Sequence, residues 1–141
     1  MRPLCLLATA LTLATPAMAQ QRAEFIDGTY VIAEGACEKL KALAAGSTPM
    51  ISTVPFYVTA DGFSFWEGGC GFASVTKSKD AWHVIAACEE NGDEYTETYS
   101  FRRSSPDSFE VTLTTPGVSD EQATPLRYTR CDVGDIPEMS P

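Results

Sequence analysis

Few residues in this sequence could carry out catalysis. His83 is the only histidine, so any mechanism that needs an imidazole would have to use it. Alternation along its strand places His83 on a polar, outward face opposite Ser100, whereas a serine or cysteine nucleophile needs the ring beside it in a concavity. No phosphate-binding loop, CxxC, HExxH or GxSxG motif occurs in the sequence. We therefore expect a protein that is not an enzyme, with no catalytic residues, cofactor or metal.

Glu97 is the residue best suited to holding a ligand. The same alternation places it on the inward strand face, where its neighbours are the aromatic residues Trp82, Tyr95 and Tyr99, and a carboxylate in such a place could anchor a ligand. Arg130, on the last predicted strand, is the candidate cation. The structural alternative is a Glu97–Arg130 ion pair, or a carboxylate at the rim of a barrel. A hydrolase that uses Glu97 is a further alternative, although one carboxylate does not make a glycosidase pair.

Tyr57 and Trp66 form a candidate partner-binding patch. Asp61-Gly62 predicts a tight hairpin turn, and the resulting register sets Tyr57 opposite Trp66 on the face turned away from Val58 and Phe65. Exposed, the two rings would suit a protein or glycan partner. Covered by the helix described below, they would be a second small core, which is the arrangement we expect.

Turn chemistry and cysteine spacing agree on how the central strands pair. Asn91-Gly92 is typical of a type I′ turn, which needs positive φ at both positions, and counting outward sets Cys88 opposite Tyr95. A three-residue turn at 78–80 would then set Cys70 opposite Cys88. Directly opposed strand residues have the geometry of a disulfide, so we predict this bridge.

The remaining cysteines complete the covalent framework. Residues 1–19 are typical of a secretory signal peptide, with one basic residue, an apolar stretch and Ala17-Met18-Ala19 before Gln20. Its removal takes away Cys5 and leaves Cys37 to pair with Cys131 in an oxidising compartment. In the chain-entropy model the shorter loop contributes about 3 kcal/mol and the longer one about 4.5 kcal/mol. We expect a periplasmic or secreted protein.

Alternating apolar residues predict an all-β domain over residues 20–131, with a flexible acidic tail over 132–141. One short helix is expected within residues 36–46. Cys37 follows the first strand and Cys131 ends the last, so an odd number of strands would bring the two together. We therefore expect residues 63–76 to form one bent strand and the meander to have seven strands, with eight as the alternative. Both counts predict an antiparallel, lipocalin-like barrel or sandwich.

The acidic composition restricts the possible partners. The formal net charge is −9, and loss of Arg2 with the leader makes it −10. Such a surface disfavours nucleic acid and anionic membranes and favours either solubility, as in an ordinary solvated exported protein, or a basic partner. No segment after the leader is apolar enough for membrane insertion. Four acids beside Asn91-Gly92 match no calcium loop. We expect a monomer that binds a protein or a small molecule.

Four segments resemble small four-cysteine bacterial periplasmic proteins that have no assigned activity. The segments are GTY before Cys37, TADGFSFWEGGC around Cys70, CEENGDEYTET from Cys88 and YTRC at Cys131. The resemblance covers most of the mature chain and implies a fold and a compartment. Periplasmic lysozyme and protease inhibitors are similar in size, β-content and disulfide use. The aromatic-rich sheet, the acidic surface that could meet a basic protein such as a lysozyme, and the lack of catalytic groups lead us to favour a binding or inhibitor module. The alternative is a lipocalin-type carrier of a small apolar ligand.

Overall fold

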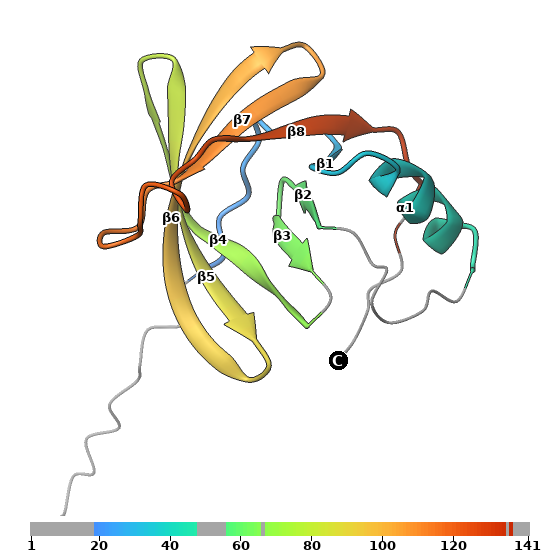
Figure 1. Cartoon of the computed structure of the whole chain (residues 1–141), viewed down its shortest axis with the longest axis horizontal. Helices are drawn as coiled ribbons and strands as arrows, with labels where there is room; N and C mark the ends of the chain where they lie inside the picture. The colour runs from blue at the N-terminus through green and yellow to red at the C-terminus, as the bar shows by residue number, and fades with distance from the viewer. Residues whose placement is uncertain (1–18, 48–55, 66, 135, 137–141) are drawn as a thin grey trace, which may run out of the picture.

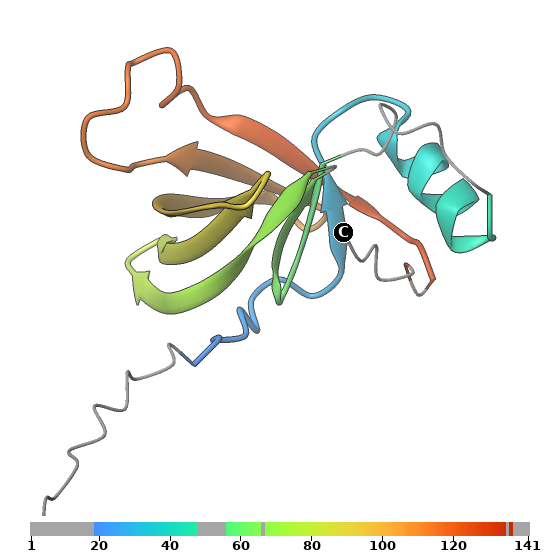
Figure 2. The same ribbon diagram turned by 90° about the horizontal axis from the view of Figure 1, so that it is seen from below.

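Eight antiparallel strands form a closed barrel (Figure 1). The computed structural model describes residues 19–47, 56–65, 67–134 and 136. Each strand pairs with the next along the chain, and the last strand pairs with the first. The strands are β1 (Thr29–Val31), β2 (Tyr57–Thr59), β3 (Gly62–Phe65), β4 (Gly68–Ser78), β5 (Ala81–Glu90), β6 (Asp93–Ser105), β7 (Ser108–Leu113) and β8 (Leu126–Cys131). One helix, α1 (Ala36–Ala44), follows β1 and lies beside the barrel in both ribbon views (Figures 1 and 2).

Aromatic side chains fill the middle of the barrel. Phe101 has no exposed surface, and its ring centroid lies 5.5 to 6.2 Å from those of four other phenylalanines, Phe25, Phe63, Phe72 and Phe109. Tyr30, Val58 and Val84 are also almost fully buried. The centre of the barrel is therefore packed rather than hollow.

The predicted pairing of β5 with β6 is confirmed. Asn91 and Gly92 both have positive φ, 53° and 85°, as the type I′ turn requires. Glu90 pairs with Asp93, and the register places Cys88 opposite Tyr95 and Ala86 opposite Glu97. The inward and outward faces of these two strands are thus those that the alternation predicts.

The predicted disulfide between β4 and β5 forms, but the residues between this disulfide and the turn pair differently from the prediction. The turn has two residues rather than three, because Ser78 pairs with Ala81. This shifts the register by one position, but a β-bulge between Phe72 and Ser74 adds one residue to β4 and restores it. Cys70 therefore lies opposite Cys88, and the two form a disulfide.

The predicted turn at Asp61-Gly62 is wrong by one position. Thr59 pairs with Gly62, so Tyr57 faces Ser64, and Trp66 lies outside the described residues. Gly62 serves a close approach between strands, since a Cβ there would lie 1.8 Å from the carbonyl oxygen of Cys70. The shift equals two residues in register, so Val58 and Phe63 still share the inward face and are buried.

The expectation of seven strands is wrong, and the eight-strand alternative is correct. Phe65 pairs with Gly68, so the chain reverses there instead of continuing as one bent strand. The segment between β1 and α1 accounts for the cysteine geometry. Cys131 pairs with Thr29 at the start of β1, and residues 32–35 return the chain so that Cys37, in the first turn of α1, forms the disulfide with Cys131. The disulfide framework is therefore as predicted, although the strand count is not.

Helix α1 covers a second, smaller core outside the barrel. Leu40 and Leu43 are buried against Val31 of β1 and Cys131 of β8, and Tyr57 packs against the same cluster. Val133 and Ile136, in the region predicted to be a flexible tail, also pack there, whereas Asp135 and residues 137–141 lie outside the described part. Tyr57 is thus part of a small core, which is the structural alternative to a partner-binding patch.

Candidate ligand site at the barrel mouth

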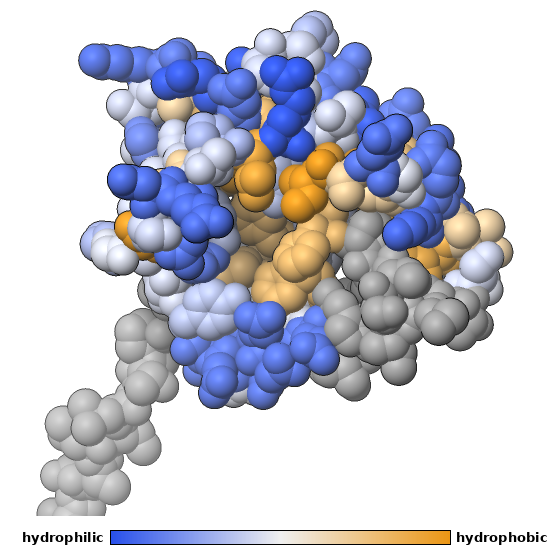
Figure 3. All heavy atoms as spheres, in the orientation of Figure 1, coloured by the Kyte–Doolittle hydropathy of each residue, from blue (hydrophilic) through white to orange (hydrophobic). Residues whose placement is uncertain are grey.

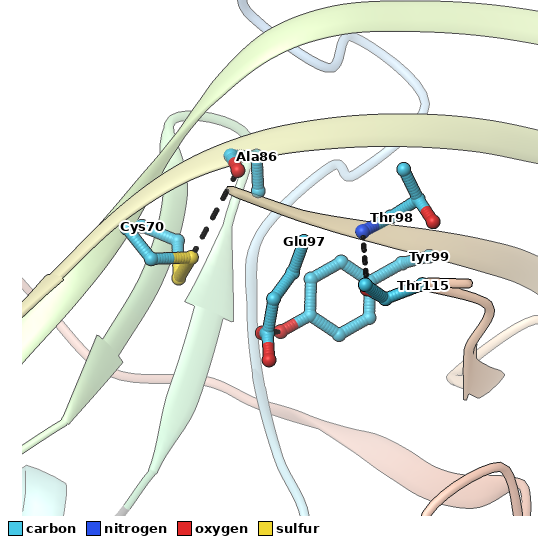
Figure 4. The surroundings of a disulfide bond; sticks show 7 residues. Cys70, Ala86, Glu97, Thr98, Tyr99 and Thr115 are labelled. Atoms are coloured by element: carbon cyan, nitrogen blue, oxygen red, sulfur yellow. Dashed lines mark hydrogen bonds between the residues drawn. A yellow bond between two sulfur atoms is a disulfide. The ribbon is translucent and has the colours of Figure 1, made fainter. Parts of the chain in front are cut away.

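Glu97 lies at one end of the barrel among tyrosines. Tyr95, Glu97 and Tyr99 alternate along β6 and face inward, and all three are half-buried. The Tyr99 hydroxyl donates a hydrogen bond to Oε2 of Glu97. A Glu97 carboxylate oxygen and the sulfur atoms of Cys70 and Cys88 lie within 4.8 Å of one another, and Figure 4 shows the carboxylate between the disulfide and the Tyr99 ring.

Aromatic and aliphatic side chains surround this carboxylate. The ring of Phe63 lies 4.7 Å from that of Tyr99 and 6.1 Å from that of Tyr128. Leu126 shares the strand face of Tyr128 but is 51% exposed. Figure 3 shows a patch of hydrophobic atoms on one face of the molecule, with hydrophilic residues on several sides of it. We call Tyr95, Glu97, Tyr99, Leu126 and Tyr128 the mouth.

The tyrosines of the mouth remain protonated at neutral pH. Burial, and then the hydrogen bond to Glu97, raise the pKa of Tyr99. Burial raises the pKa of Tyr128 to about 12. The pKa of Tyr95 is also raised, by burial and by the negative charge of Glu97. Neutral hydroxyls donate and accept hydrogen bonds but are poor general bases, so these three tyrosines are suited to hydrogen bonding with a ligand rather than to accepting a proton.

The expected Glu97–Arg130 pair does not form. Arg130 is held at the other end of the barrel, where it lies 2.6 Å from Asp27 and 3.4 Å from Asp107. Among the described residues no lysine or arginine forms an ion pair with Glu97. The sequence outside them contains a single basic residue, Arg2. The carboxylate of the mouth therefore lacks a cationic partner within the described structure.

Trp82 is also separated from the mouth. Its ring stacks on Phe25, with centroids 4.4 Å apart and planes at 10°. Phe25 belongs to the N-terminal segment, residues 20–27, which we call the plug because Ala23 and Ile26 are buried in the barrel core. The alternation of β5 gives the face of Trp82 correctly, but the residue lies toward the plugged end.

A cluster of charges fixes the plug, and sequence reasoning missed it. Asp27 accepts a hydrogen bond from the Tyr30 hydroxyl and pairs with Arg130 and Arg103. Arg103 also donates to the Phe25 carbonyl oxygen and lies 4.2 Å from the ring centroid of Phe109. The one signal in the sequence is the apolar Phe25-Ile26 pair, which stands among polar residues shortly before the first strand.

We expect this cluster to make stability depend on pH. The Tyr30 hydroxyl, and then Arg130, hold the pKa of Asp27 well below its ordinary value of 3.8. The folded state binds this proton less tightly than the unfolded state, so the stabilisation is complete above pH 3.8 and is lost as the pH falls below it. In urea unfolding at pH 7 and pH 3, Asp27→Asn and Tyr30→Phe should therefore lose less stability on acidification than the wild type. An Asp27→Asn protein with the full wild-type loss would contradict this role.

The single histidine of the sequence lies on the surface of the protein. His83 is exposed and pairs with Ser100 on the outer face.

A shallow groove of about 510 Å³ crosses the outside of β4, β5 and β6, and Gly69, Gly71 and Ala87 contribute to its lining. Within the part of the chain that the structure describes, no helix is long and apolar enough to cross a membrane.

Comparison of the chain with protein families, with curated proteins and with solved structures finds no match. Fold and site alone therefore define the class of protein. It is an antiparallel eight-stranded barrel with a packed interior, a plugged end and a carboxylate at its mouth. Its two disulfides, Cys37–Cys131 and Cys70–Cys88, are those of a protein from an oxidising, extracytoplasmic environment.

Proposed function

We propose that the protein is a non-enzymatic binding module of the periplasm or the extracellular space, of the partner-binding or inhibitor type. The observation that carries this proposal is Glu97, a half-buried carboxylate without a basic partner in the described structure, set among neutral tyrosines over a packed barrel. An acidic protein with such a group at its surface is suited to a basic partner.

The plug supports removal of a leader after Ala19. Gln20 donates a side-chain hydrogen bond to the Asp61 carbonyl oxygen, and the Gln21 backbone N–H donates to Phe72. Among the described residues, Gln20 and Gln21, the first two of the proposed mature chain, thus both contact the barrel. Cleavage there would leave the plug in place and deliver the cysteines to a compartment where they oxidise.

The packed interior favours a partner-binding role over a carrier of apolar molecules. A lipocalin-type carrier encloses its ligand in a cavity, whereas Phe101, Phe72 and Phe109 occupy the centre of this barrel without exposed surface. A ligand at the mouth would remain partly outside the protein. A group presented by a larger partner satisfies this geometry better than a molecule that must be enclosed.

The proposal is tested by titrating the mature protein, from Gln20, into a panel of basic proteins that includes several lysozymes. We expect at least one partner to bind and, for an inhibited lysozyme, to lose cell-wall lysis. Glu97→Gln should weaken that binding about tenfold, since a hydrogen bond to a charged group contributes about 1.5–3 kcal/mol. The matched control is Glu94→Gln, which removes the same charge from an exposed residue of the same strand and should change affinity less than about threefold. No binding to any member of the panel at stoichiometric excess would discard the proposal.

A further inference from the structure

We propose that the mouth binds one lysine or arginine side chain of the partner protein, with the positive charge of that side chain against Glu97. The inference rests on the proposed function and adds the chemical group that is recognised. Three features of the described residues carry it: the free hydrogen-bonding capacity of the carboxylate, the absence of a described lysine or arginine paired with it, and the apolar packing beside it.

The first feature is hydrogen-bonding capacity. Tyr99 donates to Oε2 of Glu97, and the described side chains provide no hydrogen bond to Oε1. A carboxylate can accept about four hydrogen bonds, so an incoming ammonium or guanidinium group can be accommodated without displacing Tyr99. The hydroxyl oxygens of neighbouring neutral tyrosines can accept the remaining donors of the cation.

The second feature is charge. No lysine or arginine of the described residues forms an ion pair with Glu97, and two inward-facing arginines, Arg103 and Arg130, are paired with Asp27 at the plugged end. A cation that enters the mouth therefore meets one uncompensated negative charge. The rings of Tyr95 and Tyr99 beside it can add a cation–π attraction, which needs a ring centroid within about 6 Å of the cation. A neutral ligand would gain neither contribution.

The third feature is the apolar packing beside the carboxylate. The ring of Phe63 lies 4.7 Å from that of Tyr99 and 5.8 Å from that of Phe101, and Phe101 has no exposed surface. A lysine or arginine side chain has an aliphatic stem that can lie against apolar residues while its charged end reaches a carboxylate. We therefore assign the occupant to a side chain projecting from a protein surface.

Capped amino acids test this directly on the mature protein with both disulfides intact. The probes are the Nα-acetyl amides of lysine, arginine and norleucine, the last being an apolar analogue without charge. Titrations are followed by ¹⁵N–¹H shifts, up to about 20 mM because a single group binds with a dissociation constant of about 1 mM or weaker. We expect saturable shifts at Tyr95, Glu97 and Tyr99 for the lysine or the arginine probe, and none for norleucine.

Variants separate the mouth from the general acidity of the surface. Glu97→Gln should reduce the affinity for the charged probe at least about tenfold, and Glu94→Gln less than about threefold. Equal binding of norleucine, absence of saturation with both charged probes, or unchanged affinity in Glu97→Gln would each overturn the inference. The norleucine comparison needs only wild-type protein, so it remains decisive where a variant does not fold. If basic proteins bind while the charged probes do not, the inference fails and the proposed function stands.

Discussion

Replacing Cys37 and Cys131 by serine is expected to lower the free energy of unfolding by about 4.5 kcal/mol. The bridge spans 94 residues, and cross-linking such a long loop removes much of the conformational entropy of the unfolded chain. It also holds α1 against the outer face of the barrel, where Leu40 is fully buried. Because domains of this size are stable by only about 5–15 kcal/mol, this loss would remove from about a third to nearly all of the free energy of unfolding.

The measurement is guanidinium unfolding of the mature protein under non-reducing conditions. The matched variant is Cys70→Ser with Cys88→Ser, whose bridge spans 18 residues and should contribute about 3 kcal/mol. Removal of the Cys37–Cys131 bridge should therefore lower the free energy of unfolding more than removal of the Cys70–Cys88 bridge. A loss below about 1 kcal/mol for the first pair would show that the unfolded chain is already restricted by other means.

Phe101→Ala is expected to lower the free energy of unfolding by about 3–5 kcal/mol, the usual cost of removing a buried phenylalanine ring and leaving a cavity. Phe101 is completely buried and is within 6.2 Å, centroid to centroid, of four other phenylalanine rings. No neighbouring part of the closed barrel can collapse into the space without distorting strand pairing. The loss should appear as a lower urea midpoint.

The control for this variant is Ile85→Ala on the neighbouring strand. Ile85 is 41% exposed on the outer face, so its truncation removes little buried surface and should cost less than about 1 kcal/mol. Equal losses of stability in the two variants would contradict a packed interior. The preference for a partner-binding role over a carrier would then no longer hold.

The pairing of β5 with β6 was predictable from the sequence because two local constraints act on these strands. Asn91-Gly92 requires one turn type, and a strand pair with a buried face tolerates no one-residue slip. The faces of Cys88 and Glu97 follow from that turn by counting. The Cys70–Cys88 bridge was predicted with a turn one residue too long, and the β-bulge after Phe72 compensates for the error. A bulge of this kind leaves no distinct pattern in the residue types.

The strand count was not predictable because glycine has several uses. Gly62 reads as a turn residue, yet it lies in β3, where only hydrogen fits against the carbonyl oxygen of Cys70. Gly68 has the same role against the carbonyl oxygen of Glu89. Such close approaches depend on which strand becomes the neighbour, and this is decided by tertiary structure.

The candidate site was predicted in part. Alternation correctly gave the shared face of Tyr95, Glu97 and Tyr99, but it also grouped them with Trp82 and Arg130, which lie toward the plugged end. A period of two residues gives the face of a side chain, whereas its height along the barrel depends on how neighbouring strands are staggered. The plug itself has no periodicity, so neither Phe25 nor Asp27 was predicted as a neighbour of those two residues.

In the proposed complex, Glu97, within the mouth, contacts the positive end of a lysine or arginine side chain. Intermolecular nuclear Overhauser effects between the capped lysine probe and ¹³C-labelled protein test it most directly. The account predicts contacts from the lysine ε-methylene protons to the ring protons of Tyr95 or Tyr99, together with a shift of the Glu97 carboxyl carbon. Contacts confined to the exposed acids Glu89 and Glu94, with the Glu97 carbon unchanged, would contradict it.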